Sequence, residues 1–355
     1  MTLARMLSAL AVFAIVLPAA ARAADYPAPR VGEWVVKDFR FHTGDVLPEL
    51  RLHYTTVGDP TGEPVLILHG TAGSGASLLT ANFAGELLGP GQPLDARSHF
   101  IVLPDAIGHG KSSKPSDGLR ARFPHYNYDD MVVAQYRLLT EHLGLRHVRL
   151  VLGSSMGGML TWTWGELYPT FMDALVPLAS EPAAMAGRNW MMRRMVIDAI
   201  RRDPEWKGGD YTRQPPALKT AQVFFSVATS GGARALYTAT PTREQTDAEL
   251  DRRLELPQGT DANDVLYQFD ASRDYDPAPH LNAITARLLA INSADDERNP
   301  PELGVMEQAM TRIKSGRYIL LPITSQSRGH GTTGNAALWK SHLAELLQST
   351  PRSAP

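Results

Sequence analysis

Short runs rich in apolar residues recur along the chain and alternate with segments in which apolar residues repeat every three or four positions. Six runs that are typical of strands buried in a sheet lie at residues 65–68, 100–103, 148–152, 174–178, 288–292 and 316–321. Two further stretches, 31–41 and 50–57, are predicted to pair as strands. The apolar residues within 131–139 share one face of a helix that Asp129 can cap. Strands and helices that alternate in this way predict an α/β fold with a doubly wound, mostly parallel sheet.

The spacing of these runs divides the chain into a sheet domain and an insertion. Residues 24–180 hold the first part of the predicted sheet domain, and residues 288–348 hold the second part. The intervening residues 181–287 are rich in Arg, Met, Trp, Pro and Gly, with helical patterning at 191–202 and 246–254. A segment of this length between two strands predicts an inserted helical cap. The side chains expected to pack inside the cap are Trp190, Met191, Met192 and Met195.

Residues 1–23 have the pattern of a secretory signal peptide. Arg5 precedes an uncharged apolar run at 6–17, and the small residues that follow end at Ala23. We expect cleavage after Ala23 and therefore a periplasmic or secreted mature chain. The apolar run is shorter than the roughly 20 residues that span a membrane, so no membrane span is expected in the mature chain. At the other end, residues 348–355 are expected to be frayed.

The composition excludes several classes of partner. The 355 residues carry a formal net charge of −2 without a long run of one sign, which is no electrostatic footprint for nucleic acid. The chain has no cysteine, so disulfides, thiolate metal sites and a cysteine nucleophile are excluded. It contains no dinucleotide fingerprint, Walker loop or metal-binding histidine motif, and we expect neither a cofactor nor a metal. The oligomeric state is not predicted.

A G-x-S-x-G motif places Ser155 after a predicted strand and before a predicted helix. A tight turn from strand to helix needs glycine neighbours, and it exposes the hydroxyl of the central serine as a nucleophile. The start of the helix would direct the backbone N–H of Met156 at an oxyanion. The loop after the run at 65–68 would supply the backbone N–H of Thr71 as a second donor.

A serine hydroxyl needs a base to remove its proton, and the base needs an orienting carboxylate. His330 lies between two glycines in a polar loop after the run at 316–321, and we expect it to be the base. Asp295 and Asp296 follow the run at 288–292, and only one of them can face His330. Serine, aspartate and histidine then occur in the order expected for a nucleophile on a strand-to-helix turn.

Four segments carry further motifs. They are P-D-A-I-G-H-G-K-S-S-K-P at 104–115, D-M-V at 130–132, G-S-S-M-G-G at 153–158 and A-I-R-R-D-P-E-W-K-G-G-D-Y at 199–211. Together they resemble the homoserine O-acetyltransferase group of the α/β-hydrolase superfamily. The resemblance implies an α/β-hydrolase fold in which Ser155 takes the acyl group, His330 acts as general base and acid, and Asp296 orients His330. Asp296 stands four residues before Pro300, a spacing common after this strand in related enzymes, which favours it over Asp295.

We expect an exported serine hydrolase that cleaves a small carboxylic ester through an acyl-enzyme on Ser155. Export would separate the enzyme from acetyl-CoA, and the histidine loop at 329–334 lacks the bulky residues expected beyond the transferase histidine. The alternatives are an acyl-CoA-dependent O-acyltransferase of the homoserine O-acetyltransferase type and a non-enzymatic binding protein on the same fold. Four arginines of the predicted cap can recognise a carboxylate, although we expect them to be solvated: Arg188, Arg193, Arg194 and Arg273.

Overall fold

A computed structural model describes residues 25–229 and 231–353, so the predicted signal peptide at 1–23 lies outside the described residues. The strands within these residues are Arg30–Arg40 (β1), Val46–Val57 (β2), Glu63–Leu68 (β3), His99–Pro104 (β4), Val148–Ser154 (β5), Met172–Leu178 (β6), Arg287–Ser293 (β7) and Gly316–Leu321 (β8). They form one sheet in the order β1-β2-β4-β3-β5-β6-β7-β8. β2 pairs antiparallel with β1 and β4, whereas the strands from β4 to β8 pair in parallel. The predicted α/β fold with a mostly parallel sheet is confirmed.

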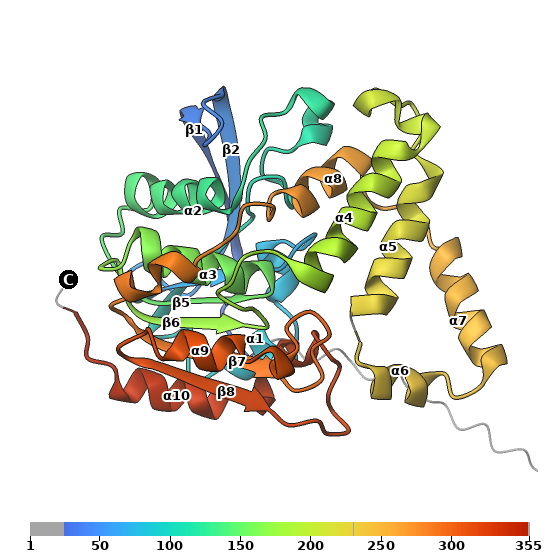
Figure 1. Cartoon of the computed structure of the whole chain (residues 1–355). Coiled ribbons are helices and arrows are strands. Elements are labelled where there is room, and N and C mark those ends of the chain that lie inside the picture. The colour runs from blue at the N-terminus through green and yellow to red at the C-terminus, as the bar shows by residue number, and fades with distance from the viewer. Residues whose placement is uncertain (1–24, 230, 354–355) are drawn as a thin grey trace, which may run out of the picture.

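Helices cover both faces of the sheet (Figure 1). Those of the sheet domain are Ala84–Leu87 (α1), Tyr128–Arg137 (α2), Met156–Leu167 (α3), Val305–Met310 (α9) and Lys340–Ser349 (α10). Leu66 and Leu68 of β3 pack in a core with residues of α2 and α3, whereas Val65 and Ile67 pack in a core with residues of α1 and α10. This alternation is that of a sheet buried on both faces. Within residues 25–229 and 231–353, no helix has the length and apolar character to cross a membrane.

The chain forms a group of helices after β6 and before β7. This group projects beyond the end of the sheet toward which the β6 and β8 arrows point (Figure 1). These helices, which form the cap, are Gly187–Arg202 (α4), Pro216–Thr229 (α5), Ala233–Ala239 (α6), Arg243–Glu255 (α7) and Ala262–Asp270 (α8). The Tyr267 hydroxyl of α8 lies 3.0 and 2.9 Å from the backbone carbonyl oxygens of Ala121 and Phe123, which attaches the cap to the sheet domain. The helical patterning predicted at 191–202 and 246–254 corresponds to α4 and α7.

One side of α4 is buried and the opposite side is exposed. The buried residues repeat at helical spacing and are Arg193, Val196, Ile197 and Ile200. Met191 and Met195 are 68% and 63% exposed, so the expectation that they pack inside the cap is wrong. Trp190 and Met192 are partly buried against the core, as expected. The prediction failed for the two methionines because a charged residue, Arg193, occupies the buried stripe in their place.

Helix α2 is capped by Asn127 and not by Asp129. Asn127 Oδ1 accepts from the Asp130 backbone N–H at 3.0 Å, and Asp130 Oδ2 accepts from the Asn127 backbone N–H at 3.1 Å. This reciprocal pair satisfies two N–H groups at the start of the helix, whereas Asp129 already lies inside its first turn. Asn127, as the N-cap residue, fixes Tyr128 as the first residue of α2.

The C-terminal residues dock on the sheet through Arg149. This arginine of β5 has a side chain only 2% exposed, and its Nη1 donates to Asp173 Oδ2 at 2.9 Å. The guanidinium also donates, at 2.6 to 2.9 Å, to the backbone carbonyls of Leu347, Thr350 and Pro351. The fraying expected for residues 348–355 is therefore wrong as far as the structure describes them, because a buried cation holds their carbonyl groups.

Replacing Arg149 with methionine should lower the free energy of unfolding by about 3 kcal/mol, because the buried Asp173 carboxylate would lose its cation. The value lies at the low end for a broken buried ion pair, since His147 and Ser353 also bond Asp173. Urea denaturation followed by circular dichroism measures the change. The matched control is Arg317→Met in β8, whose exposed ion pair with Glu345 should contribute less than about 1 kcal/mol. Equal losses in the two variants would contradict the role of Arg149.

Candidate active site

Ser155 lies in a strained turn between β5 and α3. Its backbone has φ 59° and ψ −117°, and a positive φ is costly for a residue with a side chain. A Cβ on Gly153 would come within 2.1 Å of the Gly157 carbonyl oxygen, and a Cβ on Gly157 within 2.1 Å of the Leu68 carbonyl oxygen. The turn therefore forms because both flanking positions are glycine, and it presents the serine hydroxyl at the end of the sheet.

Loops that follow β7 and β8 bring an aspartate and a histidine to Ser155. His330 follows β8, and its Nε2 lies 2.8 Å from Ser155 Oγ. Asp296 follows β7, and its Oδ2 lies 2.9 Å from His330 Nδ1. The Asp296 side chain is fully buried and that of His330 is 9% exposed. The structure thus joins the three residues in one hydrogen-bonded chain, in which His330 Nδ1–H donates to the carboxylate and Nε2 accepts from the hydroxyl.

The two neighbouring aspartates have different partners. Asp296 faces His330 and also accepts from Asn299 Nδ2 at 2.9 Å. Asp295 instead accepts from the Ser293 hydroxyl and, through Oδ2, from the Gly329 backbone N–H at 2.9 Å. The geometry therefore favours Asp296 as the carboxylate that orients His330, while Asp295 supports the loop on which His330 lies.

The predicted oxyanion donors lie beside Ser155 on two different elements. Met156 is the first residue of α3, where a backbone N–H has no partner within the helix. Thr71 follows Gly70 in the loop after β3, and a Cβ on Gly70 would lie 3.4 Å from Ser155 Cβ. Among the described residues, no backbone hydrogen bond uses the Thr71 N–H. Two N–H groups from separate elements next to a serine are the arrangement that can bind an oxyanion.

Opposing effects set the charges of Asp296 and His330. Burial acts to raise the pKa of Asp296, but attraction to His330 and hydrogen bonds to the carboxylate outweigh it and lower the pKa. Burial lowers the pKa of His330, and the positive charges of Arg298 and Arg193 lower it further against the opposing effect of Asp296. A neutral histidine and an ionised aspartate near pH 7 are the forms that a general base and its orienting carboxylate require.

Arg193 and Arg298 are charged neighbours of the site that the sequence did not predict there. Three of the four arginines considered for carboxylate recognition are exposed as expected, namely Arg188, Arg194 and Arg273. The fourth, Arg193, is 1% exposed. The signal that identifies Arg193 is its position on the buried stripe of α4. Arg298 follows Asp296 by two residues, and no pattern in the chain marks it.

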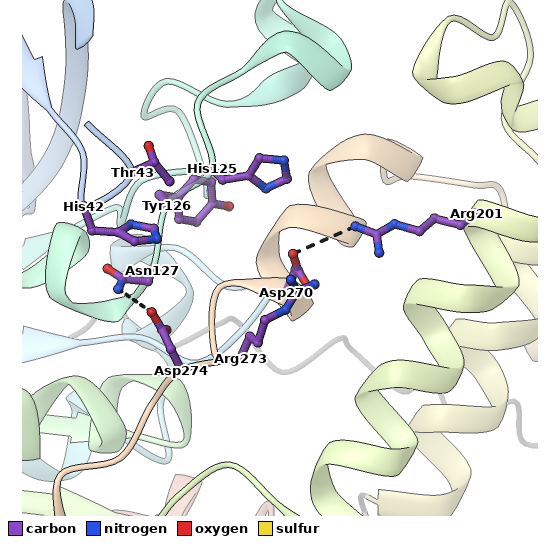
Figure 2. Close-up of a pocket in the computed structure, with 9 residues that line it drawn as sticks. All are labelled: His42, Thr43, His125, Tyr126, Asn127, Arg201, Asp270, Arg273 and Asp274. Carbon is purple, nitrogen blue, oxygen red and sulfur yellow. Dashed lines mark hydrogen bonds and ion pairs between the residues drawn. The ribbon is translucent and has the colours of Figure 1, made fainter. Parts of the chain in front are cut away.

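A separate hollow of about 380 Å³ lies between the β1–β2 turn, the loop before α2 and the C-terminal ends of α4 and α8 (Figure 2). Some of its polar side chains are paired with one another. Asn127 donates to Asp274 at 2.8 Å, and Arg201 lies 4.0 Å from Asp270. None of the three hydrogen-bonded residues described above lines this hollow. We therefore assign the chemistry to the site around Ser155.

The fold and the site together define an α/β enzyme that presents a serine on the turn between a central parallel strand and its helix. The chain belongs to the α/β hydrolase fold family, whose model matches residues 63–307. The predicted resemblance to homoserine O-acetyltransferases is confirmed by relatives of that name.

Relatives in sequence include acyltransferases. A probable acyltransferase of Methanothermobacter thermautotrophicus is 29% identical over 282 residues, which cover 77% of this chain and 85% of that protein. A homoserine O-acetyltransferase of Thermobifida fusca is 35% identical over 211 residues, which cover 55% of each protein. The chain therefore aligns with about half the length of the homoserine O-acetyltransferases that it matches.

Solved structures with the same fold include a transferase and an esterase. The homoserine O-acetyltransferase from Bacillus anthracis has a TM-score of 0.79 at 20% identity, covering 92% of this chain and 99% of that one. The acetyl esterase MekB has a TM-score of 0.77 at 22% identity, covering 90% of this chain and 97% of that one. At these identities the likeness shows the fold and does not choose between the two activities.

If Asp296 orients a catalytic His330, replacing Asp296 with asparagine should lower kcat with 4-nitrophenyl acetate by about 10⁴-fold, because a neutral amide does not stabilise the imidazolium form of His330. The matched control is Asp295→Asn, which should lower kcat by less than about tenfold, since Asp295 bonds the backbone of Gly329 and not His330. Steady-state kinetics with 4-nitrophenyl acetate measure both effects. A larger loss in Asp295→Asn would reverse the assignment.

The acidic limb of the pH profile of kcat/KM should have its midpoint below about pH 6.5, the ordinary value for histidine. A base at this position must be neutral to accept the Ser155 proton, and the pKa of His330 is lowered. Activity should therefore rise as the pH increases through this lowered pKa and be constant around neutrality. Initial rates at constant ionic strength from about pH 4 to 8 test this, and a midpoint above about pH 7 would contradict it.

Proposed function

We propose that the chain is a serine hydrolase that cleaves small carboxylic esters through an acyl-enzyme on Ser155. The observation that carries the proposal is the hydrogen-bonded chain from Ser155 through His330 to Asp296. An acyl-enzyme forms where a serine hydroxyl has a base within hydrogen-bonding distance and an oxyanion has donors ready to receive it. In this proposal Ser155 and His330 meet the first condition, and the N–H groups of Thr71 and Met156 meet the second.

Acylation would begin when Ser155 Oγ attacks the carbonyl carbon of the ester while His330 Nε2 takes the hydroxyl proton. The carbonyl oxygen becomes an oxyanion, which the two backbone N–H groups bind. The bond from the carbon to the leaving oxygen then breaks, and His330 gives its proton to the departing alcohol. Asp296 stabilises the imidazolium that exists between these proton transfers and keeps Nε2 directed at Ser155.

Deacylation would use water as the second nucleophile. His330 takes a proton from the water as its oxygen attacks the acyl carbon, and the bond to Ser155 Oγ breaks. The proton returns to Ser155, which leaves a free carboxylic acid. An acyltransferase follows the same steps with an acceptor hydroxyl in the place of water, so the two activities differ in what the cap admits to the acyl-enzyme.

An acyl-CoA-dependent O-acyltransferase is the second candidate function. It is supported by the sequence relatives, which are named as a probable acyltransferase and as homoserine O-acetyltransferases. Hydrolysis is supported by the signal-peptide pattern of residues 1–23, since a periplasmic or secreted enzyme would not meet acyl-CoA. We therefore propose export with cleavage after Ala23, which the intact mass of the exported chain tests.

Replacing Ser155 with alanine should abolish fluorophosphonate labelling and lower kcat for 4-nitrophenyl acetate by about 10⁶-fold. The matched control is Ser154→Ala, because Ser154 Oγ lies 3.3 Å from Thr333 Oγ1 and makes no bond to His330. This control should still be labelled. Intact-protein mass spectrometry and acetate release measure the two effects, and labelling of Ser155→Ala at the wild-type rate would refute the proposal.

The same preparation distinguishes hydrolysis from transfer. With 4-nitrophenyl acetate as the substrate and water as the only acceptor, we expect the wild-type protein to release acetate. With acetyl-CoA and added homoserine, we expect no release of CoA. CoA release that depends on homoserine would support the transferase instead.

A further inference from the structure

Two guanidinium groups lie near the Ser155–His330 pair, where the cap meets the sheet domain. Arg193 comes from α4 of the cap and is 1% exposed, whereas Arg298 comes from the loop after β7. Both positive charges act on His330. Burial, followed by repulsion from Arg193, lowers the pKa of Arg298 to about 10. The geometry agrees, because Arg193 lies over the Phe269 ring, Arg298 lies over the Phe225 ring, and the two ring centres are 4.9 Å apart. A buried and a partly buried positive charge that lie this near to each other are an arrangement that an anion would stabilise.

Among the residues that the structure describes, the hydrogen-bond partners of Arg193 are neutral. Its Nε donates to Asn189 Oδ1 at 3.1 Å, and its Nη1 donates to Ser272 Oγ at 3.3 Å. The guanidinium carbon lies 5.8 Å from the centre of the Phe269 ring. Among residues 25–229 and 231–353, no carboxylate oxygen lies within 4.0 Å of Arg193. Neutral partners do not repay the cost of removing a full charge from water, so Arg193 retains an unbalanced positive charge.

Arg298 differs because acidic groups lie near it. Its Nη2 donates to Thr229 Oγ1 at 2.9 Å, and its guanidinium lies 4.8 Å from the centre of the Phe225 ring. The negative charges of Asp296 and Glu297 act to raise the pKa of Arg298. The excess positive charge of the pair is therefore mainly that of Arg193, and a ligand with one negative charge would balance it.

The buried hydroxyls of Tyr128 and Thr71 lie between Arg193 and the loop after β3 that carries the proposed oxyanion donor. Tyr128 is 2% exposed, and its hydroxyl faces the side chains of Arg193, Ser272 and Thr71. Within the part of the chain that the structure describes, neither Tyr128 OH nor Thr71 Oγ1 has a partner in hydrogen-bonding geometry. Unpartnered buried donors beside an unbalanced cation point to a ligand with acceptor oxygens. Because the Thr71 backbone is also a proposed oxyanion donor, this ligand would be part of the reacting ester.

A hollow of about 300 Å³ between the start of α4 and the loop after β7 adjoins this region. Arg298 lines it, as does Asn189, the residue that holds Arg193 Nε. Glu181 and Glu297 line it as well. Burial, followed by repulsion from neighbouring carboxylates, raises the pKa of Glu181 to about 8, so this group is mostly uncharged at pH 7 and repels an anion weakly.

We propose that Arg193 and Arg298 form a carboxylate-binding subsite, and that the ester cleaved at Ser155 carries a carboxylate on its acyl chain or on its alcohol. This inference rests on the proposed function. A guanidinium group matches a carboxylate through two parallel hydrogen bonds. The one negative charge of a carboxylate also balances the one excess positive charge of the arginine pair. A phosphate dianion would bring one negative charge too many. The burial of Arg193 away from water strengthens the attraction.

Two pairs of esters, each with a charged and a neutral member of similar size, test the subsite. The acyl-side pair is mono-4-nitrophenyl succinate and 4-nitrophenyl butyrate, and the alcohol-side pair is acetoxyacetate and acetoxyacetamide. For one pair, kcat/KM of the wild type should favour the charged member by about 10- to 100-fold, which identifies the side that bears the carboxylate. Arg193→Met should remove this preference, and Arg193→Lys should keep part of it because the positive charge remains.

The readout is kcat/KM for the charged ester divided by kcat/KM for the neutral ester of the same pair. A loss of folded protein lowers both values equally and leaves this ratio unchanged. The matched control is Arg194→Met, because Arg194 is the next residue of α4, is 53% exposed and pairs with Asp198. This control should keep the wild-type ratio. An equal loss on both members of a pair in Arg193→Met would show a structural role and overturn the subsite.

The failure of the subsite and the failure of the proposed function have different signatures. If fluorophosphonate labels Ser155 and neutral esters are cleaved without preference for a charged one, the subsite is wrong and the hydrolase stands. If Ser155 is not labelled and no ester of either pair is cleaved, the proposed function fails and the subsite with it.

Discussion

The close approach of backbone to backbone around Ser155 is the constraint on which the site depends. Helix α3 lies directly on the ends of its neighbouring strands, because side chains are missing where Gly153, Gly157 and Gly158 meet carbonyl groups. A Cβ on Gly158 alone would come within 2.5 Å of the Leu178 carbonyl oxygen. This contact brings the serine hydroxyl and the first N–H groups of α3 to one point at the end of the sheet. The loops after β3, β7 and β8 reach the same point because parallel strands end at the same edge.

The parts of the site that could be predicted from the sequence are those set by local backbone geometry. The glycines around Ser155 and around His330 mark their turns directly, and strand order then requires the loops to converge. The choice between Asp295 and Asp296 could not be derived from residue types, since both are carboxylates in one loop. It depends on which of them faces His330 and which meets the Gly329 N–H, contacts that form across 34 residues of chain.

The features that sequence patterns did not predict are buried charges with distant partners. Composition treats an arginine as solvated, because isolated charges are rarely buried. Arg149 is buried because carbonyl groups about 200 residues later in the chain surround its guanidinium, such as that of Thr350, 201 residues away. Arg193 is buried because it lies on the inner face of α4, a face that the methionines of the same helix led us to misplace. The distant partners that stabilise Arg149 are visible only in the folded chain, and so is the packing that buries Arg193.

Arg298 joins the cap to the loop that orients His330. Its backbone N–H donates to Asp296 Oδ1 at 2.9 Å, while its side chain donates to Thr229 at the end of α5. A single residue thus links the position of a cap helix to the carboxylate behind the proposed base. Redesign of the cap for a new substrate is therefore not independent of catalytic rate, because a change in α5 that moves Thr229 also strains the loop that aligns His330. Substrate range and turnover would have to be engineered together.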